Sequence, residues 1–142
     1  MDIRQITDRF FAAPQIDAAD FTALAEAGFG LVINNRPDGE VGPDQHSETM
    51  RAAAEAAGLR YVVNPLTMET MTPDRQTLQR DSIAACDGKV LAYCRSGTRS
   101  TICWALAHAT EMEPTEIINA AAQGGYDISG LAPHLQSLKS GN

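Results

Sequence analysis

The sequence predicts a single α/β domain, residues 1–142, in which helices flank a central, mainly parallel sheet of four to five strands. Two observations lead to this prediction. Short apolar runs alternate with helical patterns along the whole chain, and this alternation is typical of right-handed βαβ units. The chain also has the usual length of one domain, and it contains no repeat, low-complexity segment or interdomain linker.

Five short apolar runs are expected to form the strands. They span Ile3–Ile6, Phe10–Ala13, Leu31–Asn34, Arg60–Val63 and Lys89–Tyr93. Polar loops follow the last three runs, and these loops contain NRPDGE, NPLTMET and CRSGTRS. Because ligands of parallel sheets bind beyond the carboxyl ends of the strands, we expect the three loops to form one site.

Helical patterns fill the intervals between these runs. Asp17 is a candidate N-cap and Gly28 a stop signal for the first helix, and Pro73 suits the first turn of the third. The fourth helix is apolar on most sides, so we expect it to lie at the centre of the fold. The predicted helices span residues 18–27, 46–57, 73–85, 100–110, 114–124 and a short part of the tail 130–142.

The composition is that of an ordinary soluble globular protein, with 44% hydrophobic and 20% charged residues. The net charge of −7 argues against a nucleic-acid or anionic-membrane surface, because both need clustered cations. No apolar run approaches the roughly 18–20 residues that cross a bilayer. The N-terminal segment carries charges where a signal peptide needs an apolar core. We therefore expect a cytoplasmic location.

Three cysteines, Cys86, Cys94 and Cys103, form no CxxC pair and show no metal-ligand spacing with any histidine. We therefore expect no metal and no cofactor. The odd cysteine count of a cytosolic chain also argues against a structural disulfide. Cys86 at a helix end and Cys103 within an apolar helix are interpreted as packing residues.

The segment YCRSGTRS, residues 93–100, has the pattern of an anion-binding loop between a strand and a helix. Loop amides and the helix N-terminus supply partial positive charge. Gly97 permits a backbone conformation that a side chain would resist. Arg99 offers a planar fork for two oxygens of a tetrahedral anion, and Ser100 is expected to donate a hydrogen bond to the Cys94 sulfur. All these features favour thiolate over thiol.

The predicted catalytic residues are therefore Cys94, Arg99 and Ser100, with Cys94 as the nucleophile. The rest of the loop is predicted to bind the anion, through Arg95, Ser96, Gly97 and Thr98. In the alternative interpretation, Cys94 is a buried strand-end cysteine beside two solvated arginines. That interpretation accounts less well for the positions of the glycine, the second arginine and the serine.

Arg36, in the loop NRPDGE, is expected to emerge beside the Cys94 loop if the two preceding strands are neighbours. There it either contacts the substrate or forms an ion pair with an acidic neighbour. Asp38 and Glu40 carry less weight as site residues. The same loop also suits a simple strand-to-helix turn, with Asp38-Gly39 chosen for its geometry.

Over almost its whole length, the chain resembles the phosphatase-like domain of the beta-lactamase hydrolase-like proteins, also called DUF442. The segments that carry the resemblance are APQ (13–15), GFGLVINNRPDGE (28–40), GLRYVVNPL (58–66), YCRSGTRS (93–100) and GGYDI (124–128). The resemblance implies the fold of cysteine-dependent, dual-specificity-like phosphatases. Some members are fused to a metallo-beta-lactamase-type sulfur dioxygenase, and rhodanese-type sulfur transfer is associated with the group. We expect this chain to be too short for that second domain.

Two features depart from the phosphatase pattern. Such phosphatases have five residues between cysteine and arginine, and usually a histidine before the cysteine. Here four residues separate Cys94 from Arg99, and Tyr93 precedes Cys94. This shorter CxxGxRS loop is similar to that of single-domain rhodaneses. Phosphatases also use an upstream aspartate as the acid, but the only carboxylate in NPLTMETM is Glu69, a candidate acid that is more simply interpreted as a solvated loop residue.

The first functional hypothesis is a sulfurtransferase of the rhodanese type that forms a Cys94 persulfide from a sulfane-sulfur donor, either a small anion such as thiosulfate or a persulfide, which can be protein-borne. Sulfite leaves without help from an acid, so this chemistry agrees with the missing aspartate. The alternative is a cysteine-dependent phosphatase, a hydrolase that binds a phosphate-like anion and forms a phosphocysteine. A third hypothesis is a non-catalytic sensor of an anion or persulfide. The resemblance adds one expected partner, a metallo-beta-lactamase-type sulfur dioxygenase.

Overall fold

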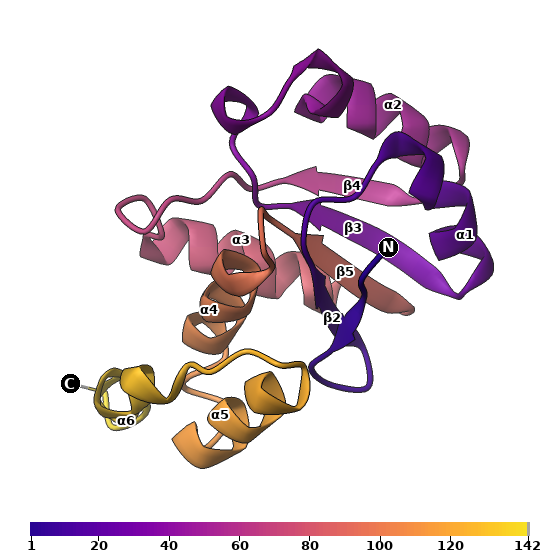
Figure 1. The fold of residues 1–142 in the computed structure, drawn as a ribbon. Helices are drawn as coiled ribbons and strands as arrows, with labels where there is room; N and C mark the ends of the chain where they lie inside the picture. The colour runs from indigo at the N-terminus through magenta and orange to yellow at the C-terminus, as the bar shows by residue number, and fades with distance from the viewer. Residues whose placement is uncertain (142) are drawn as a thin grey trace.

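The computed structural model describes residues 1–141 as one α/β domain built on a five-stranded sheet (Figure 1). The strands are β1 (Arg4–Gln5), β2 (Phe10–Ala13), β3 (Phe29–Asn34), β4 (Arg60–Val63) and β5 (Lys89–Tyr93). Their order across the sheet is β1-β2-β5-β3-β4. Only β1 and β2 are antiparallel, and the other neighbouring strands are parallel. The prediction of a mainly parallel sheet of four to five strands is therefore confirmed.

Six α-helices and four short 3-10 turns accompany the strands within the described residues. The helices are α1 (Phe21–Glu26), α2 (Ser47–Ala56), α3 (Pro73–Ala84), α4 (Thr98–Ala107), α5 (Pro114–Gln123) and α6 (Ala132–Lys139). The 3-10 turns are Ala18–Asp20, Asp38–Glu40, Pro43–Gln45 and Ser129–Leu131. Helix α4 begins two residues earlier than predicted, because Gly97 turns the chain with a φ of +94° directly before it. Arg99 consequently belongs to the first turn of α4.

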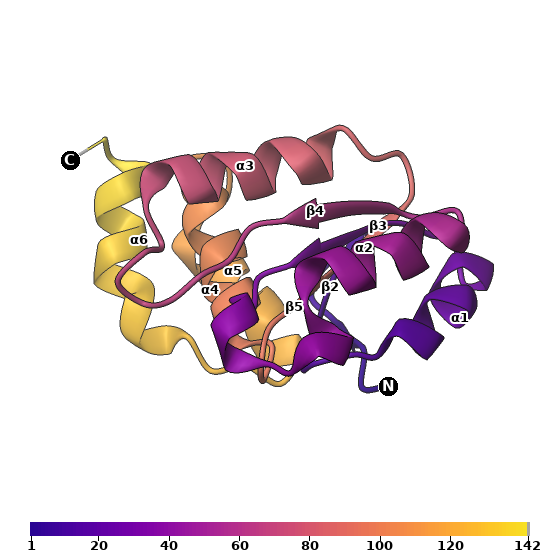
Figure 2. The same cartoon turned by 90° about the horizontal axis from the view of Figure 1, so that it is seen from above.

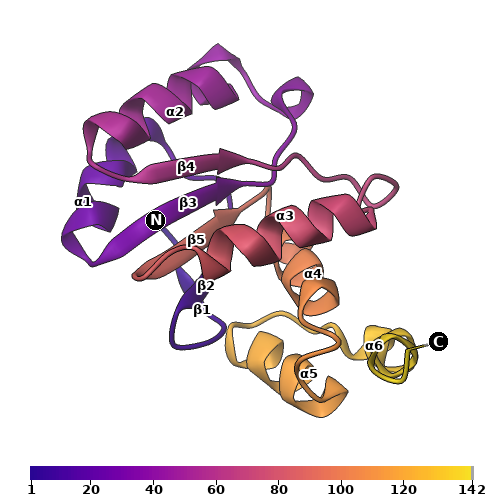
Figure 3. The ribbon, with the colours of Figure 1, turned by 180° about the vertical axis from the view of Figure 1, so that it is seen from behind.

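Helices cover both faces of the sheet, as the alternation of elements predicts. Figure 2 shows α1 and α2 on one side of the strands and α3 on the other, and Figure 3 shows the α3 side. Val32 and Leu91 point into the core with α1 and α2. Leu31 and Ile33 point into the core on the opposite face. Because successive residues of a strand face opposite sides, the central strands are apolar on both.

Helix α4 is the most buried helix, as predicted from its apolar character. Trp104 on α4 stacks against Phe10 of β2, with ring centroids 5.8 Å apart and planes inclined by 8°. Cys103 is buried on the same helix, and burial raises the pKa of its thiol to about 12. Cys86 is buried after α3, where its sulfur would lie 3.1 Å from a Cβ placed on Gly30. Both cysteines fill space in the interior, in agreement with their interpretation as packing residues.

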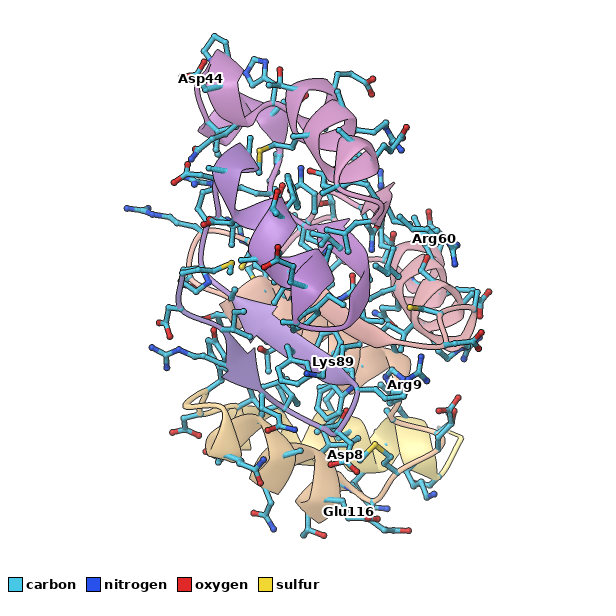
Figure 4. The ribbon with its side chains drawn as sticks, turned by 90° about the vertical axis from the view of Figure 1, so that its right-hand side faces the viewer. Asp8, Arg9, Asp44, Arg60, Lys89 and Glu116 are labelled. Atoms are coloured by element: carbon cyan, nitrogen blue, oxygen red, sulfur yellow. The ribbon has the colours of Figure 1, made fainter. Side chains whose placement is uncertain are left out.

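Three basic side chains at the amino edge of the sheet bind carbonyls at helix ends. Arg9, Arg60 and Lys89 lie where β2, β4 and β5 begin (Figure 4). Arg9 and Arg60 donate to carbonyls at the end of α3, and Lys89 donates to one after α1 at 3.1 Å. Cations stabilise helix C-termini through the helix dipole and the unpaired carbonyls. These three residues therefore serve the fold rather than an anion site.

Neither a membrane span nor a metal-binding group occurs in residues 1–141. No helix there combines the length and the apolar character needed to cross a bilayer. The same residues contain no cluster of three or more His, Cys, Asp or Glu side chains suited to a metal ion.

Candidate active site

The three loops that were expected to form one site meet at the carboxyl edge of the sheet. Strand β3 lies between β4 and β5, and the ends of all three strands are in register. Arg99 joins the loops that follow them. Its guanidinium donates to the Glu40 carboxylate in the loop after β3 and to the Leu66 carbonyl in the loop after β4.

Cys94 directly follows β5 and is buried at the floor of the loop that leads into α4. Its backbone N–H donates to the Ala13 carbonyl at 3.3 Å, which ties the residue to β2. On the loop side, the Gly97 N–H donates to the Cys94 sulfur at 3.0 Å. One backbone donor of the loop therefore points at the Cys94 sulfur, where it would stabilise negative charge.

The peptide unit between Ser96 and Gly97 is oriented by Tyr126. The Tyr126 hydroxyl donates to the Ser96 carbonyl at 3.0 Å, while the N–H of the same peptide unit points to the sulfur. A trans peptide is planar, with its C=O and N–H pointing in opposite directions, so fixing one end fixes the other. A Cβ on Gly97 would lie 2.0 Å from the Tyr126 hydroxyl, and the φ there is +94°. Only glycine fits this position.

Arg99 is held by protein acceptors on one edge of its guanidinium. Nη1 and Nη2 donate to the two carboxylate oxygens of Glu40 at 2.9 and 2.7 Å. Nη1 also donates to the Leu66 carbonyl at 2.7 Å. Since a guanidinium carries five N–H donors, the Nε–Nη2 edge keeps two for another acceptor. That this edge binds a tetrahedral anion, as the sequence predicts for Arg99, stays a prediction.

The charges around Arg99 place it beside Cys94 as well as beside Glu40. The hydrogen bond to Glu40 raises the pKa of Arg99, and the nearby Cys94 sulfur acts in the same direction. The guanidinium therefore lies near both the Glu40 carboxylate and the Cys94 sulfur.

Glu40 is the centre of an ion-pair cluster that includes Arg36 as well as Arg99. Arg36 Nε lies 3.3 Å from Glu40, and its Nη1 donates to the Gln15 side chain at 3.2 Å. Of the two roles considered for Arg36, the structure forms the ion pair with an acidic neighbour. Hydrogen bonding to Arg99 lowers the pKa of Glu40, and Arg36 adds to the effect. The ion pair between Glu40 and Arg99 therefore stabilises the folded protein fully at pH values above 4.5, the ordinary pKa of glutamate. This stabilisation is lost as the pH falls through the lowered pKa of Glu40.

The other predicted anion-binding residues fall into two groups. Arg95 is exposed, and its side chain has no ion pair or hydrogen bond with residues 1–141. It is thus a cation free to meet a negatively charged reactant. The Ser96 and Thr98 hydroxyls bind each other at 3.0 Å, and the Thr98 N–H donates to the Ser96 hydroxyl at 3.3 Å. These two side chains brace the loop at the start of α4.

The predicted hydrogen bond from Ser100 to the Cys94 sulfur is not formed. Ser100 is buried in the first turn of α4, and its hydroxyl has no hydrogen-bond partner among the described residues. The backbone carbonyl of Ser100 does have a partner, because it accepts a hydrogen bond from the Gln79 side chain at 3.3 Å. The spacing correctly placed Ser100 next to the loop. The direction of its hydroxyl depends on how α4 packs, which the spacing does not contain.

Glu69 is the one uncommitted carboxylate in the segments NRPDGE, NPLTMET and CRSGTRS. It is exposed and makes no hydrogen bond or ion pair with the part of the chain that the structure describes. Asp38 accepts from the Ser47 N–H at 2.8 Å and thereby satisfies the start of α2. Glu40 is engaged by two arginines. The surroundings of Glu69 thus resemble those of a solvated loop residue.

The sequence pattern does not single out Glu40, Tyr126 or the Leu66 carbonyl as parts of the site. Glu40 lies in a segment that also suits a plain turn, and Tyr126 lies in GGYDI, after α5. Every residue has a backbone carbonyl, so no sequence pattern can single out that of Leu66. The one available signal was that both side chains lie in segments that carry the family resemblance.

A cysteine after a central parallel strand, a glycine-turned loop and an arginine in the next helix lie together on a fold of the dual-specificity phosphatase type. The chain belongs to the family described as the phosphatase-like domain of the beta-lactamase hydrolase-like protein, whose model matches residues 2–111. The resemblance seen in the sequence is thereby confirmed.

Curated relatives extend well beyond the part that this chain matches. The beta-lactamase hydrolase-like protein of Xylella fastidiosa (strain Temecula1) is 34% identical over 131 residues, which cover 90% of this chain and 30% of the relative. The protein of the same description from Agrobacterium fabrum is 31% identical over 147 residues, which cover 94% of this chain and 34% of the relative. The chain thus spans about a third of the length of these relatives.

Solved structures share the fold. A phosphatase candidate from Neisseria meningitidis has a TM-score of 0.82 at 28% identity, covering 96% of this chain and 98% of that chain. A kinase-associated phosphatase, with its catalytic-site cysteine replaced by serine, has a TM-score of 0.73 at 12% identity and covers 99% and 93%. This second likeness concerns the fold alone. These comparisons favour the phosphatase alternative and give no support to the sulfurtransferase hypothesis.

The first prediction concerns the ion pair that holds Arg99. Glu40→Gln should weaken vanadate binding about tenfold, because the amide cannot accept from both Nη atoms and the guanidinium loses its fixed orientation. Titration calorimetry measures the affinity. Asp38→Asn, in the same loop but in contact with Ser47, is the control and should bind vanadate like the parent protein. Equal losses in both variants would assign the effect to the loop rather than to the ion pair.

The second prediction concerns the peptide unit that Tyr126 orients. Tyr126→Phe removes one hydrogen bond worth about 1 kcal/mol, so the alkylation of Cys94 by iodoacetamide at pH 7 should slow about fivefold. Mass spectrometry of the modified peptide gives the rate. The control is Tyr61→Phe, which removes a buried hydroxyl bonded to Tyr93 at 2.6 Å in the core with α1 and α2, without contact to the Ser96–Gly97 peptide unit. An unchanged rate in Tyr126→Phe would contradict the role given to its hydroxyl.

Proposed function

We propose that this domain hydrolyses phosphate monoesters through a phosphocysteine on Cys94. The observation that carries the proposal is the Gly97 N–H aimed at the Cys94 sulfur, beside a guanidinium edge with two uncommitted donors. A transferring phosphoryl group spreads charge over three equatorial oxygens, and catalysis consists mainly of positioning and electrostatic stabilisation. Loop amides and Arg99 supply the donors for those oxygens.

The reaction proceeds in two displacements. In the first, the Cys94 thiolate attacks phosphorus, an S–P bond forms, and the ester P–O bond breaks with its electron pair leaving on the alcohol or phenol oxygen. In the second, water attacks the phosphocysteine, the S–P bond breaks, and orthophosphate and the thiolate are released. Arg95 contributes attraction for the anionic substrate at the mouth of the loop.

The substrate class follows from the carboxylates. Glu40 is held ionised by its arginines and Asp38 caps α2, so neither is placed to protonate a leaving group. Glu69 is exposed and has no partner among the described residues that would fix its direction. A phenol has a pKa of about 10 and leaves more readily as an anion than an alkyl alcohol does. We therefore assign aryl phosphates, such as phosphotyrosine, as the preferred substrates.

Sulfur transfer is the second candidate function, and one observation favours it. Four residues separate Cys94 from Arg99, as in single-domain rhodaneses, and a persulfide adds only one sulfur atom for the amides to enclose. The thiolate would attack the sulfane sulfur of thiosulfate, forming one S–S bond as the other breaks and sulfite leaves. A metallo-beta-lactamase-type sulfur dioxygenase would be the partner that consumes such a persulfide.

The third prediction separates these candidates on one preparation. With an aryl phosphate, rapid acid quenching should trap a protein heavier by about 80 mass units, and Cys94→Ser should abolish this adduct. With thiosulfate, the sulfur-transfer candidate requires an adduct of about 32 mass units on Cys94. A persulfide with sustained turnover, but no phosphate release, would reverse the order of the two functions. Anion binding without either adduct would leave the non-catalytic sensor.

The fourth prediction concerns Glu69. If this residue is solvated, Glu69→Gln should change aryl-phosphate hydrolysis by less than about threefold, far below the 10²–10⁴-fold effect of a general acid. The control is Glu48→Gln, another exposed glutamate, on α2. Steady-state rates for an aryl and an alkyl phosphate are compared for each variant. A loss of about 10²-fold or more in Glu69→Gln would identify Glu69 as the acid and extend the substrates to alkyl phosphates.

A further inference from the structure

Three amide side chains are buried behind the Cys94 loop. Asn35 follows β3, Asn64 follows β4 and Gln79 lies in α3, and each has an exposed fraction of 0%. Gln79 Oε1 accepts from Asn35 Nδ2 at 2.8 Å and from Asn64 Nδ2 at 3.1 Å. Gln79 Nε2 donates to the Ser100 carbonyl of α4 at 3.3 Å. This amide cluster (Asn35, Asn64 and Gln79) joins two strand ends to two helices around one side chain.

Burying the amide cluster in the protein interior costs free energy of folding. Buried polar groups are unfavourable unless all of their hydrogen bonds are made. Here Oδ1 of Asn35, Oδ1 of Asn64 and the Ser100 hydroxyl have no partner among the described residues. Apolar side chains of similar size would avoid that penalty. The arrangement therefore points to a task beyond packing.

The amide cluster is linked to the anion-binding groups through the backbone of Asn35. The Asn35 N–H donates to the Tyr93 carbonyl at 2.8 Å, directly before the nucleophile. The Asn35 carbonyl accepts from the Leu66 N–H at 2.9 Å. The Leu66 carbonyl then accepts from Arg99 Nη1 at 2.7 Å. Asn35 thus links the end of β5 to Leu66, whose carbonyl binds Arg99. Gln79 holds Asn35 in place through the hydrogen bond to its side chain.

We propose that Gln79 is a positioning residue for the anion-binding loop. It acts on the guanidinium of Arg99 through Asn35 and Leu66, and on the first turn of α4 through the Ser100 carbonyl. The inference rests on the proposed function for its meaning in catalysis, but its effect on anion binding at Cys94 does not require turnover.

The test measures how well sulfate protects Cys94 from iodoacetamide. Sulfate is a tetrahedral dianion that does not titrate between about pH 5 and pH 8, so it serves as a stable probe. In Gln79→Leu, the half-protecting sulfate concentration should rise about tenfold, because the donors that surround the anion lose their alignment. The value of kcat/KM on an aryl phosphate should fall by a similar factor.

Ile83→Ala is the matched control for stability. Ile83 is buried on the same helix and gives no side-chain hydrogen bond to the amide cluster. The substitution should lower Tm, as expected for a truncated core residue, and leave sulfate protection within about twofold of the wild type. Circular dichroism at the assay temperature confirms that each variant is folded.

Gln79→Glu separates positioning from packing. A protonated carboxyl group accepts with one oxygen and donates with the other to the Ser100 carbonyl, whereas the ionised form has no donor. Because burial raises the pKa of a carboxyl group, the variant should be protected like the wild type at about pH 5. At about pH 8, the half-protecting sulfate concentration of this variant should be about tenfold higher than that of the wild type. This variant also keeps the test open if Gln79→Leu does not fold.

Several outcomes would overturn the proposal. A folded Gln79→Leu variant that sulfate protects as well as the wild type would show that the amide cluster serves packing only. Equal loss of protection in Ile83→Ala, or a Gln79→Glu variant indifferent to pH, would lead to the same conclusion. If the expected protection pattern appears but the wild type hydrolyses no aryl phosphate, the proposed function fails and the positioning role stands. A wild type that sulfate does not protect overturns both.

Discussion

The orientation of one peptide unit, between Ser96 and Gly97, is the constraint on which the rest of the site depends. Its N–H points at the Cys94 sulfur only because the chain turns through a positive φ at Gly97. The hydroxyl that holds the other end of the unit comes from Tyr126, 30 residues further along the chain. Helix α4 begins immediately after this turn, so the same geometry carries Arg99 into position beside the nucleophile. Sheet, loop and C-terminal helices are thus coupled at one amide.

The electrostatics of the site combine attraction with rigidity. The chain as a whole carries a net charge of −7. Three arginines nevertheless lie in the loops at the carboxyl edge of the sheet, namely Arg36, Arg95 and Arg99. Glu40 offsets part of their positive charge and at the same time fixes two of the guanidinium groups. An arginine that is already oriented loses less side-chain entropy when it binds an anion. The site therefore exchanges some long-range attraction for a preorganised donor edge.

Tyr93 occupies the position where phosphatases usually have a histidine, and its environment gives it a different task. Its hydroxyl lies 2.6 Å from that of Tyr61 in the core beneath α1 and α2. Burial raises the pKa of both phenols, that of Tyr61 to about 12. Both hydroxyls consequently stay neutral in the physiological range. The pair stabilises the interior next to the nucleophile without supplying it with a charge.

The sequence by itself determined the elements and the nature of the reactive loop. Alternating apolar runs and helical patterns depend on local periodicity, so strands such as Arg60–Val63 and Lys89–Tyr93 were predicted with their observed bounds. The strand–loop–helix pattern around Cys94 is equally local, and its glycine and arginine spacing predicts an anion site there. The family resemblance was readable for the same reason, because its motifs are short segments of contiguous residues.

Only the tertiary structure decided how those residues are oriented. Glu40 and Arg99 are 59 residues apart, and their pairing arises because β3 and β5 are neighbours with aligned ends. The roles of Tyr126 and Gln79 likewise depend on helices that pack against the loop from distant parts of the chain. The Ser100 hydroxyl was assigned to the sulfur from spacing alone, and packing of α4 left it without that bond. Spacing along the chain specifies which residues share a loop, whereas long-range packing sets the direction of each donor and acceptor, and that direction determines the chemistry.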